Sequence, residues 1–102
     1  MIEKNIFRIQ FGRMKEAKAL WMDMIAVLKP AINSKIRVLT DLTGPAYTLV
    51  LELELQDYLQ MVQQQEQWKA SSEVADLYRR FTQLCDSSER ILYNLEYESG
   101  GF

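Results

Sequence analysis

The stretch YTLVLELEL at residues 47–55 decides the fold, because two kinds of side chain alternate along it. Tyrosine or leucine occupies every odd position, and threonine, valine or glutamate occupies every even one. This period of two predicts a β-strand with one apolar face. The preceding Thr-Gly-Pro at residues 43–45 has the composition of a turn, and residues 35–41 are again strand-like. We therefore expect a hairpin of two strands.

Helical and strand patterns continue outward from this hairpin. Apolar residues at helical spacing predict a helix over residues 13–29, ended by Pro30, and a helical region over residues 57–85. Asp57 with Gln60 resembles a capping box, and Ser71 offers a second helix start, so we expect this region to be broken near residues 69–72. Residues 5–11 and 89–97 alternate as strands.

The resulting order, β-α-β-β-α-β, is that of a ferredoxin-like α+β fold, with a four-stranded antiparallel sheet and helices on one face. The strand pattern predicts which residues lie on each face. We expect the helices to cover Phe7, Ile9, Phe11, Ile36, Val38, Leu49, Leu51, Leu53, Ile91, Tyr93 and Leu95. We expect the other face to carry Ile6, Arg8, Gln10, Arg37, Leu39, Thr48, Val50, Glu52, Leu92 and Asn94. Phe81 lies at the centre of the apolar stripe of the last helix, so it should be buried.

Composition narrows the class of protein. A length of 102 residues predicts one domain over residues 1–102. A net charge of −2 argues against nucleic-acid binding, and no apolar run is long enough for a membrane helix. The lone cysteine, Cys85, cannot form an internal disulfide. We expect a cytoplasmic protein with no nucleic-acid or membrane partner.

The chain contains no histidine, and this absence restricts the possible reactions more than any other feature of its composition. Histidine is the usual acid–base residue near neutral pH and the commonest metal ligand in proteins. Triads that use histidine are excluded within the chain, as are histidine-ligated zinc and haem. We expect no metal and no cofactor, with carboxylates, tyrosines, asparagine, arginine or tryptophan left to act.

The second face of the sheet is mixed rather than polar. Leu39, Val50 and Leu92 would form part of an exposed apolar patch, which is typical of a protein interface. Pairing two such faces would give a homodimer with a closed barrel; the alternative is a monomer whose sheet stays in water. Arg8, Arg37 and Glu52 could converge there as an anion site, or as ion pairs within a dimer interface.

The order of elements, the length near 100 residues and the broken second helical region resemble the dimeric α+β barrel superfamily. That superfamily includes antibiotic-biosynthesis-type monooxygenases and NIPSNAP-type proteins, and the resemblance spans residues 6–97. Its haem-degrading members use an Asn, a Trp and a His. Asn5 and Trp68 match the first two, but the missing histidine argues against haem. Asn5, Trp68 and Tyr78 remain the catalytic candidates, with cap or core roles as the alternative.

Aromatic residues offer a ligand site between the helices and the sheet. Phe7, Trp21, Trp68, Tyr78 and Tyr93 could line a pocket there, or simply form the core. Buried tyrosine hydroxyls need partners, so Trp68, Tyr78 and Tyr93 are the ligand-binding candidates. Gly12 could present backbone amides to an anion, or serve the turn alone. Cys85 is expected to pack rather than react.

Three functions follow from these observations. The first is a monooxygenase-like enzyme without a cofactor, acting on a small aromatic or apolar substrate as a homodimer. The second is a non-catalytic ligand-binding or interaction module resembling the ACT domain, with an amino acid held by the Gly12 turn and the sheet edge. The third, an RNA-recognition module, needs aromatics on the open sheet face, where Thr48, Val50, Glu52 and Glu54 stand instead.

Overall fold

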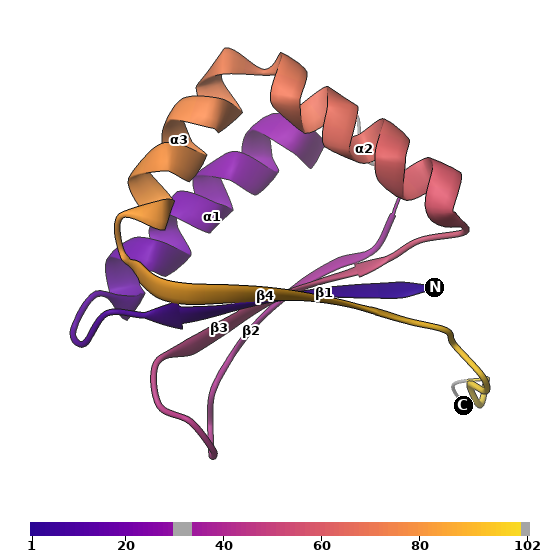
Figure 1. The fold of residues 1–102 in the computed structure, drawn as a ribbon, viewed down its shortest axis with the longest axis horizontal. Helices are drawn as coiled ribbons and strands as arrows, with labels where there is room; N and C mark the ends of the chain where they lie inside the picture. The colour runs from indigo at the N-terminus through magenta and orange to yellow at the C-terminus, as the bar shows by residue number, and fades with distance from the viewer. Residues whose placement is uncertain (30–33, 101–102) are drawn as a thin grey trace.

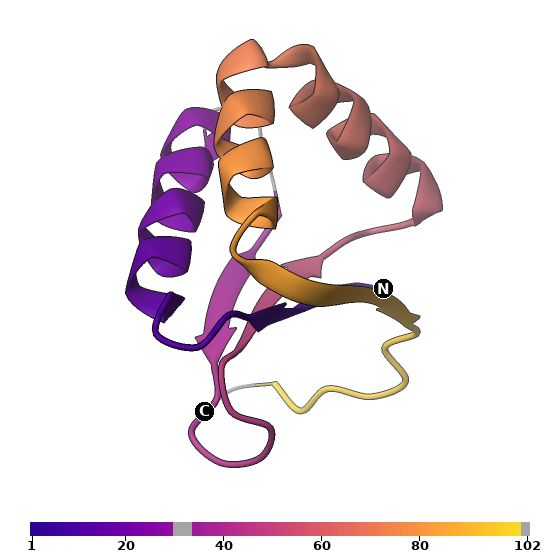
Figure 2. The ribbon, with the colours of Figure 1, turned by 60° about the vertical axis from the view of Figure 1, so that its left-hand side comes forward.

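The computed structural model describes residues 1–29 and 34–100 and has the predicted order of elements (Figure 1). The strands are β1 (Ile2–Ile9), β2 (Ile36–Thr40), β3 (Thr48–Glu54) and β4 (Cys85–Tyr93). The helices are α1 (Met14–Leu28), α2 (Tyr58–Ala70) and α3 (Ser72–Thr82). The sheet has the strand order β2-β3-β1-β4, and all neighbouring strands are antiparallel. All three helices lie on one face of it (Figure 2). The predicted ferredoxin-like α+β fold is confirmed.

The predicted break in the second helical region is confirmed at Ser71. Its hydroxyl accepts a hydrogen bond from the backbone N–H of Val74, which satisfies an amide at the start of α3. The Asp57 carboxylate accepts one from the backbone N–H of Gln60 at the start of α2. The Gln60 side chain accepts from the backbone N–H of Gln56 rather than of Asp57, so the capping box is displaced by one residue.

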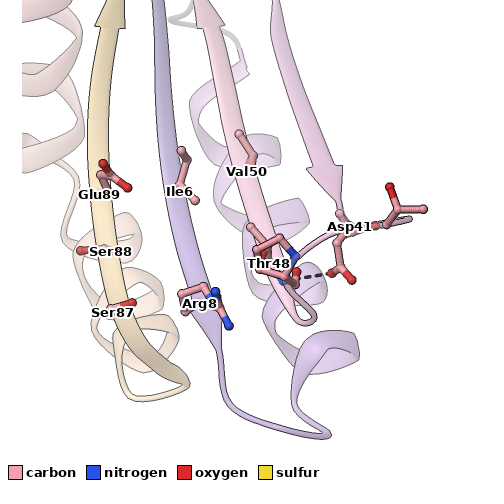
Figure 3. A pocket seen from close by; sticks show the side chains of 11 residues that line it. Ile6, Arg8, Asp41, Thr48, Val50, Ser87, Ser88 and Glu89 are labelled. Carbon is pink, nitrogen blue, oxygen red and sulfur yellow. Dashed lines mark hydrogen bonds between the residues drawn. The ribbon is translucent and has the colours of Figure 1, made fainter.

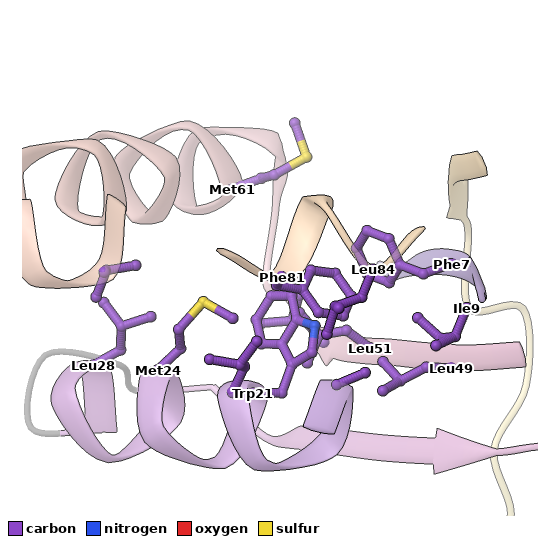
Figure 4. Close-up of a cluster of buried hydrophobic side chains, with 14 of the residues drawn as sticks. Phe7, Ile9, Trp21, Met24, Leu28, Leu49, Leu51, Met61, Phe81 and Leu84 are labelled. Atoms are coloured by element: carbon purple, nitrogen blue, oxygen red, sulfur yellow. The ribbon is translucent and has the colours of Figure 1, made fainter. Parts of the chain in front are cut away.

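The core lies between the sheet and α1 and α3, and Phe81 is at its centre. Phe81 is fully buried, as predicted, and its ring meets Phe7 and Trp21 edge-on at centroid distances of 4.8 and 5.4 Å (Figure 4). Helix α2 contributes less, because only Met61 and Gln64 of its residues are buried. Within the described residues, no helix is long and apolar enough to cross a membrane. The predicted helix stop at Pro30 lies outside the described residues; α1 ends at Leu28.

The last strand departs from the prediction in position and in orientation. The helical region ends at Thr82 rather than at residue 85, and β4 starts at Cys85. Its register pairs Arg90 with Asn5 and Ile91 with Lys4. Side chains of directly paired residues share a face. Ile91 and Tyr93 therefore lie on the face away from the helices, and Leu92 lies on the helix face, opposite to the prediction.

The reason is that β4 is an edge strand with apolar residues on both of its faces, so alternation alone cannot orient it. Leu95 was also expected on the helix face, but it lies beyond the end of β4. Phe11 was expected to be buried, but it lies beyond the end of β1 and is 86% exposed. Its ring lies tilted against that of Tyr47, at a centroid distance of 5.0 Å.

Candidate functional site

A cavity of about 560 Å³ lies between the sheet and the helices, and it is the candidate site. Phe7, Leu51 and Leu53 of the sheet line it on one side. Trp21 of α1, Trp68 of α2 and Tyr78 of α3 line it from the helices. Its volume is in the range of small-ligand sites, which are mostly apolar with a few polar groups.

The aromatic side chains around this cavity are in mutual contact. The ring centroid of Trp21 lies 6.1 Å from that of Trp68 and 6.1 Å from that of Tyr78. Trp21 is 1% exposed and is held between Phe7 and Phe81 as well, which fixes its orientation. The fold therefore brings together four members of the predicted aromatic group. They are Phe7, Trp21, Trp68 and Tyr78; Phe81 joins them, and Tyr93 does not.

Polar groups on the sheet form the opposite part of the lining. The Asn5 amide donates to Glu3 Oε1 at 3.3 Å, and its oxygen accepts from Arg90 Nε at 3.1 Å. Arg90 Nε also lies 3.2 Å from Glu3 Oε1. Glu3 is only 5% exposed, so its charge requires this pairing. Asn5, Glu3 and Arg90 thus form one network beside the cavity.

Glu3 and Arg90 were not among the candidates from the sequence. The expected first strand began at residue 5, whereas β1 begins at Ile2. Extending the alternation of Phe7 and Ile9 backwards places Asn5 and Glu3 on the same apolar face, which is the signal that could have found them. Arg90 could not be found in this way, because its place depends on the pairing of β4 with β1.

Tyr78 keeps its proton in this setting. Tyr78 is 39% exposed, and its partial burial raises the pKa of the phenol above the ordinary value; the nearby Cys85 adds to the rise, and Arg90 partly opposes it. The hydroxyl is therefore a hydrogen-bond donor at neutral pH. Tyr78 and Trp68 line the cavity, as the pocket prediction has them, and Asn5, a catalytic candidate, lines it as well.

Tyr93 does not border this cavity, so its predicted place there is wrong. It pairs with Ile2 in the sheet and lies on the open face, where the ammonium group of Lys4 sits 5.7 Å from its ring centroid. The edge-strand register described above is the cause.

The open face of the sheet has a wider hollow of about 790 Å³ (Figure 3). Arg37 and Lys4 both form ion pairs with the buried carboxylate of Glu52 on this face. Arg8 does not join them, because it pairs with Thr48, four residues before Glu52 in β3. The predicted convergence of Arg8, Arg37 and Glu52 is thus wrong for Arg8. The helix–sheet cavity is the better candidate for a ligand site, since it combines aromatic walls with a buried polar network.

Two other residues have local roles. Gly12 has φ +79°, a backbone conformation that favours glycine. It lines neither hollow, so its position agrees with a role in the turn rather than in an anion site. The Cys85 thiol donates to the carbonyl of Phe81 at 3.5 Å. Burial raises its pKa to about 11, with a smaller contribution from Asp86, so it is a poor nucleophile near neutral pH.

Comparisons with known proteins place the fold. No family model and no curated protein matches the sequence. A NIPSNAP family protein of Agrobacterium tumefaciens superposes with a TM-score of 0.82 at 20% identity, over 94% of this chain and 93% of that one. An uncharacterized NIPSNAP domain protein of Burkholderia xenovorans gives 0.81 at 18%, over 97% and 98%.

A candidate antibiotic biosynthesis monooxygenase of Nitrosomonas europaea gives a TM-score of 0.75 at 8% identity, over 94% of this chain and 98% of that one. The resemblance expected from the order of elements is thereby confirmed at the level of the fold. The chain has the α+β fold that NIPSNAP family proteins share with antibiotic biosynthesis monooxygenase-like proteins.

Proposed function

We propose that the helix–sheet cavity binds a small aromatic or apolar molecule, and that the protein acts on it as a monooxygenase-like enzyme without a cofactor. One observation carries this proposal. The cavity collects Asn5, Trp68 and Tyr78 from three separate elements onto an apolar lining. A likeness in fold to candidate monooxygenases supports the type of reaction.

The reaction is balanced when the substrate supplies all four electrons. Dioxygen then converts an activated methylene into a carbonyl: one oxygen atom forms the new C=O bond, and the other leaves as water with the two methylene hydrogens. The protein supplies position and hydrogen bonds. Trp68 would stack on the ring, and the protonated Tyr78 would donate to an oxygen of the substrate or of the reduced dioxygen.

Oxygen uptake with Tyr78→Phe and a matched control tests this proposal. Substrates would be aromatic compounds with an activated methylene, measured at an oxygen electrode beside the uncatalysed rate. Tyr78→Phe removes only the hydroxyl and should lower kcat about tenfold or more. Tyr58→Phe makes the same change at a 64% exposed position that does not line the cavity, and it should leave kcat unchanged. Uptake no faster than without protein would refute catalysis.

A binding module without catalysis is the second candidate, and Asn5 favours it. Both ends of its amide are already engaged, one with Glu3 and the other with Arg90. An asparagine held in this way is less free to orient a reacting group. Stoichiometric binding of an aromatic ligand by calorimetry, with no oxygen uptake, would support this candidate. The amino-acid site at Gly12 receives no support, since Gly12 lines neither hollow.

We also propose that the open face of the sheet is a homodimer interface. No helix of the described residues covers it (Figures 1 and 2). It presents Ile6, Val50 and the 41% exposed Leu39 around a carboxylate whose charge is already paired. Two such faces packed together would remove this apolar surface from water.

Sedimentation at tens of micromolar tests the dimer. The native chain should give twice the 12.0 kDa mass. Val50→Lys should give the monomer, because it would bury an unpaired charge at the centre of the interface. Leu42→Lys is the control, since Leu42 is 97% exposed in the hairpin and should not affect assembly. A native monomer would contradict the proposal.

A further inference from the structure

Three buried N–H donors lack a hydrogen-bond partner among the described residues. They are Trp21 Nε1, Trp68 Nε1 and Gln65 Nε2. Buried polar groups without a partner are rare in native proteins and costly in free energy. All three belong to side chains that line the helix–sheet cavity. Their concentration at one site indicates that the missing acceptor belongs to a ligand.

The donors gather on the helix side of the cavity. Gln65 and Trp68 are three residues apart, so they share one face of α2. Trp21 meets Trp68 from α1, with ring centroids 6.1 Å apart. The sheet side is different, because the Glu3 carboxylate there is already paired with Arg90. An acceptor would therefore face α2, away from the carboxylate of Glu3.

The charged side chains around the cavity favour an anionic acceptor. Of the residues that the structure describes, three cations and one carboxylate line the cavity, in a chain whose net charge is −2. Arg90 pairs with Glu3, and Arg79 pairs with Asp76. Lys69, next to Trp68, forms no ion pair within the described residues. Among the described cations that line the cavity, it is the unpaired one, and it lies on α2 with Gln65 and Trp68.

We propose that the ligand of this cavity is an aromatic carboxylate, which deepens the proposed function by naming the class of molecule bound. Its ring lies among Trp21, Trp68 and Tyr78, and its carboxylate accepts from Gln65 and Trp68 beside Lys69. Because the side-chain nitrogens of Gln65 and Trp68 are shielded from solvent, α2 has to shift slightly to present them. Helix α2 is suited to this shift, since only Met61 and Gln64 of its residues are buried.

Calorimetry with three probes of one ring system tests the class of ligand. The probes are 2-naphthoate, 2-naphthylmethanol and 2-naphthylmethylamine at pH 7, which are anionic, neutral and cationic. The naphthoate should bind at least about tenfold more tightly than the alcohol, and the amine most weakly. Equal binding of naphthoate and alcohol, or no binding of any probe at millimolar concentration, would overturn the proposal.

A matched pair of variants tests the position of the carboxylate. Gln65→Glu replaces the orphaned donor by a negative charge and should weaken naphthoate binding about tenfold or more. Gln67→Glu adds the same charge on α2 at an exposed position that does not line the cavity, and should have little effect. Equal losses from both variants would show a general charge effect and overturn the assignment.

Gln65→Leu separates binding from folding. It removes the unsatisfied donor, so the free protein should melt at the same temperature or higher, while naphthoate affinity falls. Unchanged affinity would contradict the role of Gln65. The binding test can also fail or succeed independently of the proposed catalysis. If naphthoate binds but methylene substrates cause no oxygen uptake, catalysis is refuted and the proposed class of ligand is retained.

Discussion

Replacement of Phe81 by alanine should remove a large part of the stability of this protein. Phe81 is fully buried, and its ring centroid lies 4.8 Å from that of Phe7 and 5.4 Å from that of Trp21. Loss of a buried Phe side chain costs roughly 3–5 kcal/mol from transfer and cavity terms. Domains of this size are stable by only about 5–15 kcal/mol, so the variant would be close to unfolding.

Urea denaturation at one fixed protein concentration measures this effect. With a slope of roughly 1–3 kcal/mol per M, the midpoint should fall by about 1–5 M for Phe81→Ala. Phe81→Leu keeps most of the apolar volume and should cost less, about 1–3 kcal/mol from two lost edge-on ring pairs. Phe11→Ala is the control, because Phe11 is 86% exposed and its midpoint should shift little. Equal shifts for Phe81→Ala and Phe11→Ala would refute the packing described here.

Three further predictions concern the helix break and the groups that titrate. Ser71→Ala removes the cap of α3 and should cost about 0.5–2 kcal/mol by urea denaturation, whereas Ser99→Ala, beyond the last strand, should cost nothing measurable. Cys85, with a pKa of about 11, should be alkylated at pH 8 roughly a hundredfold more slowly than an ordinary thiol, and a rate equal to that of a free thiol would contradict its burial. Burial raises the pKa values of Tyr78 and Cys85, and both groups are neutral when protonated, so the folded chain holds these protons to higher pH than the unfolded chain. The resulting stability is fully present below about pH 8 and falls as the pH rises towards 11, which thermal melts across that range would detect.

The order of elements and the central strand could be predicted because their signals are local. Alternation over residues 48–54 and the caps at Asp57 and Ser71 depend on neighbours in the chain, and each was found in the structure. Three of the four candidate site residues, Asn5, Trp68 and Tyr78, line one cavity for the same reason. Each lies on a helix or strand face that sequence periodicity already orients.

The place of β4 was decided only by the tertiary structure. Its alternating residues are apolar on both faces, so either set could face the helices. The pairing of Arg90 with Asn5 selects one set, moves Tyr93 to the open face and brings Arg90 to Glu3. The sequence by itself therefore determined which elements form and which faces of β1 and β3 are apolar. The polar network at the cavity depends on contacts between residues 85 or more positions apart, and local periodicity has no information on such contacts.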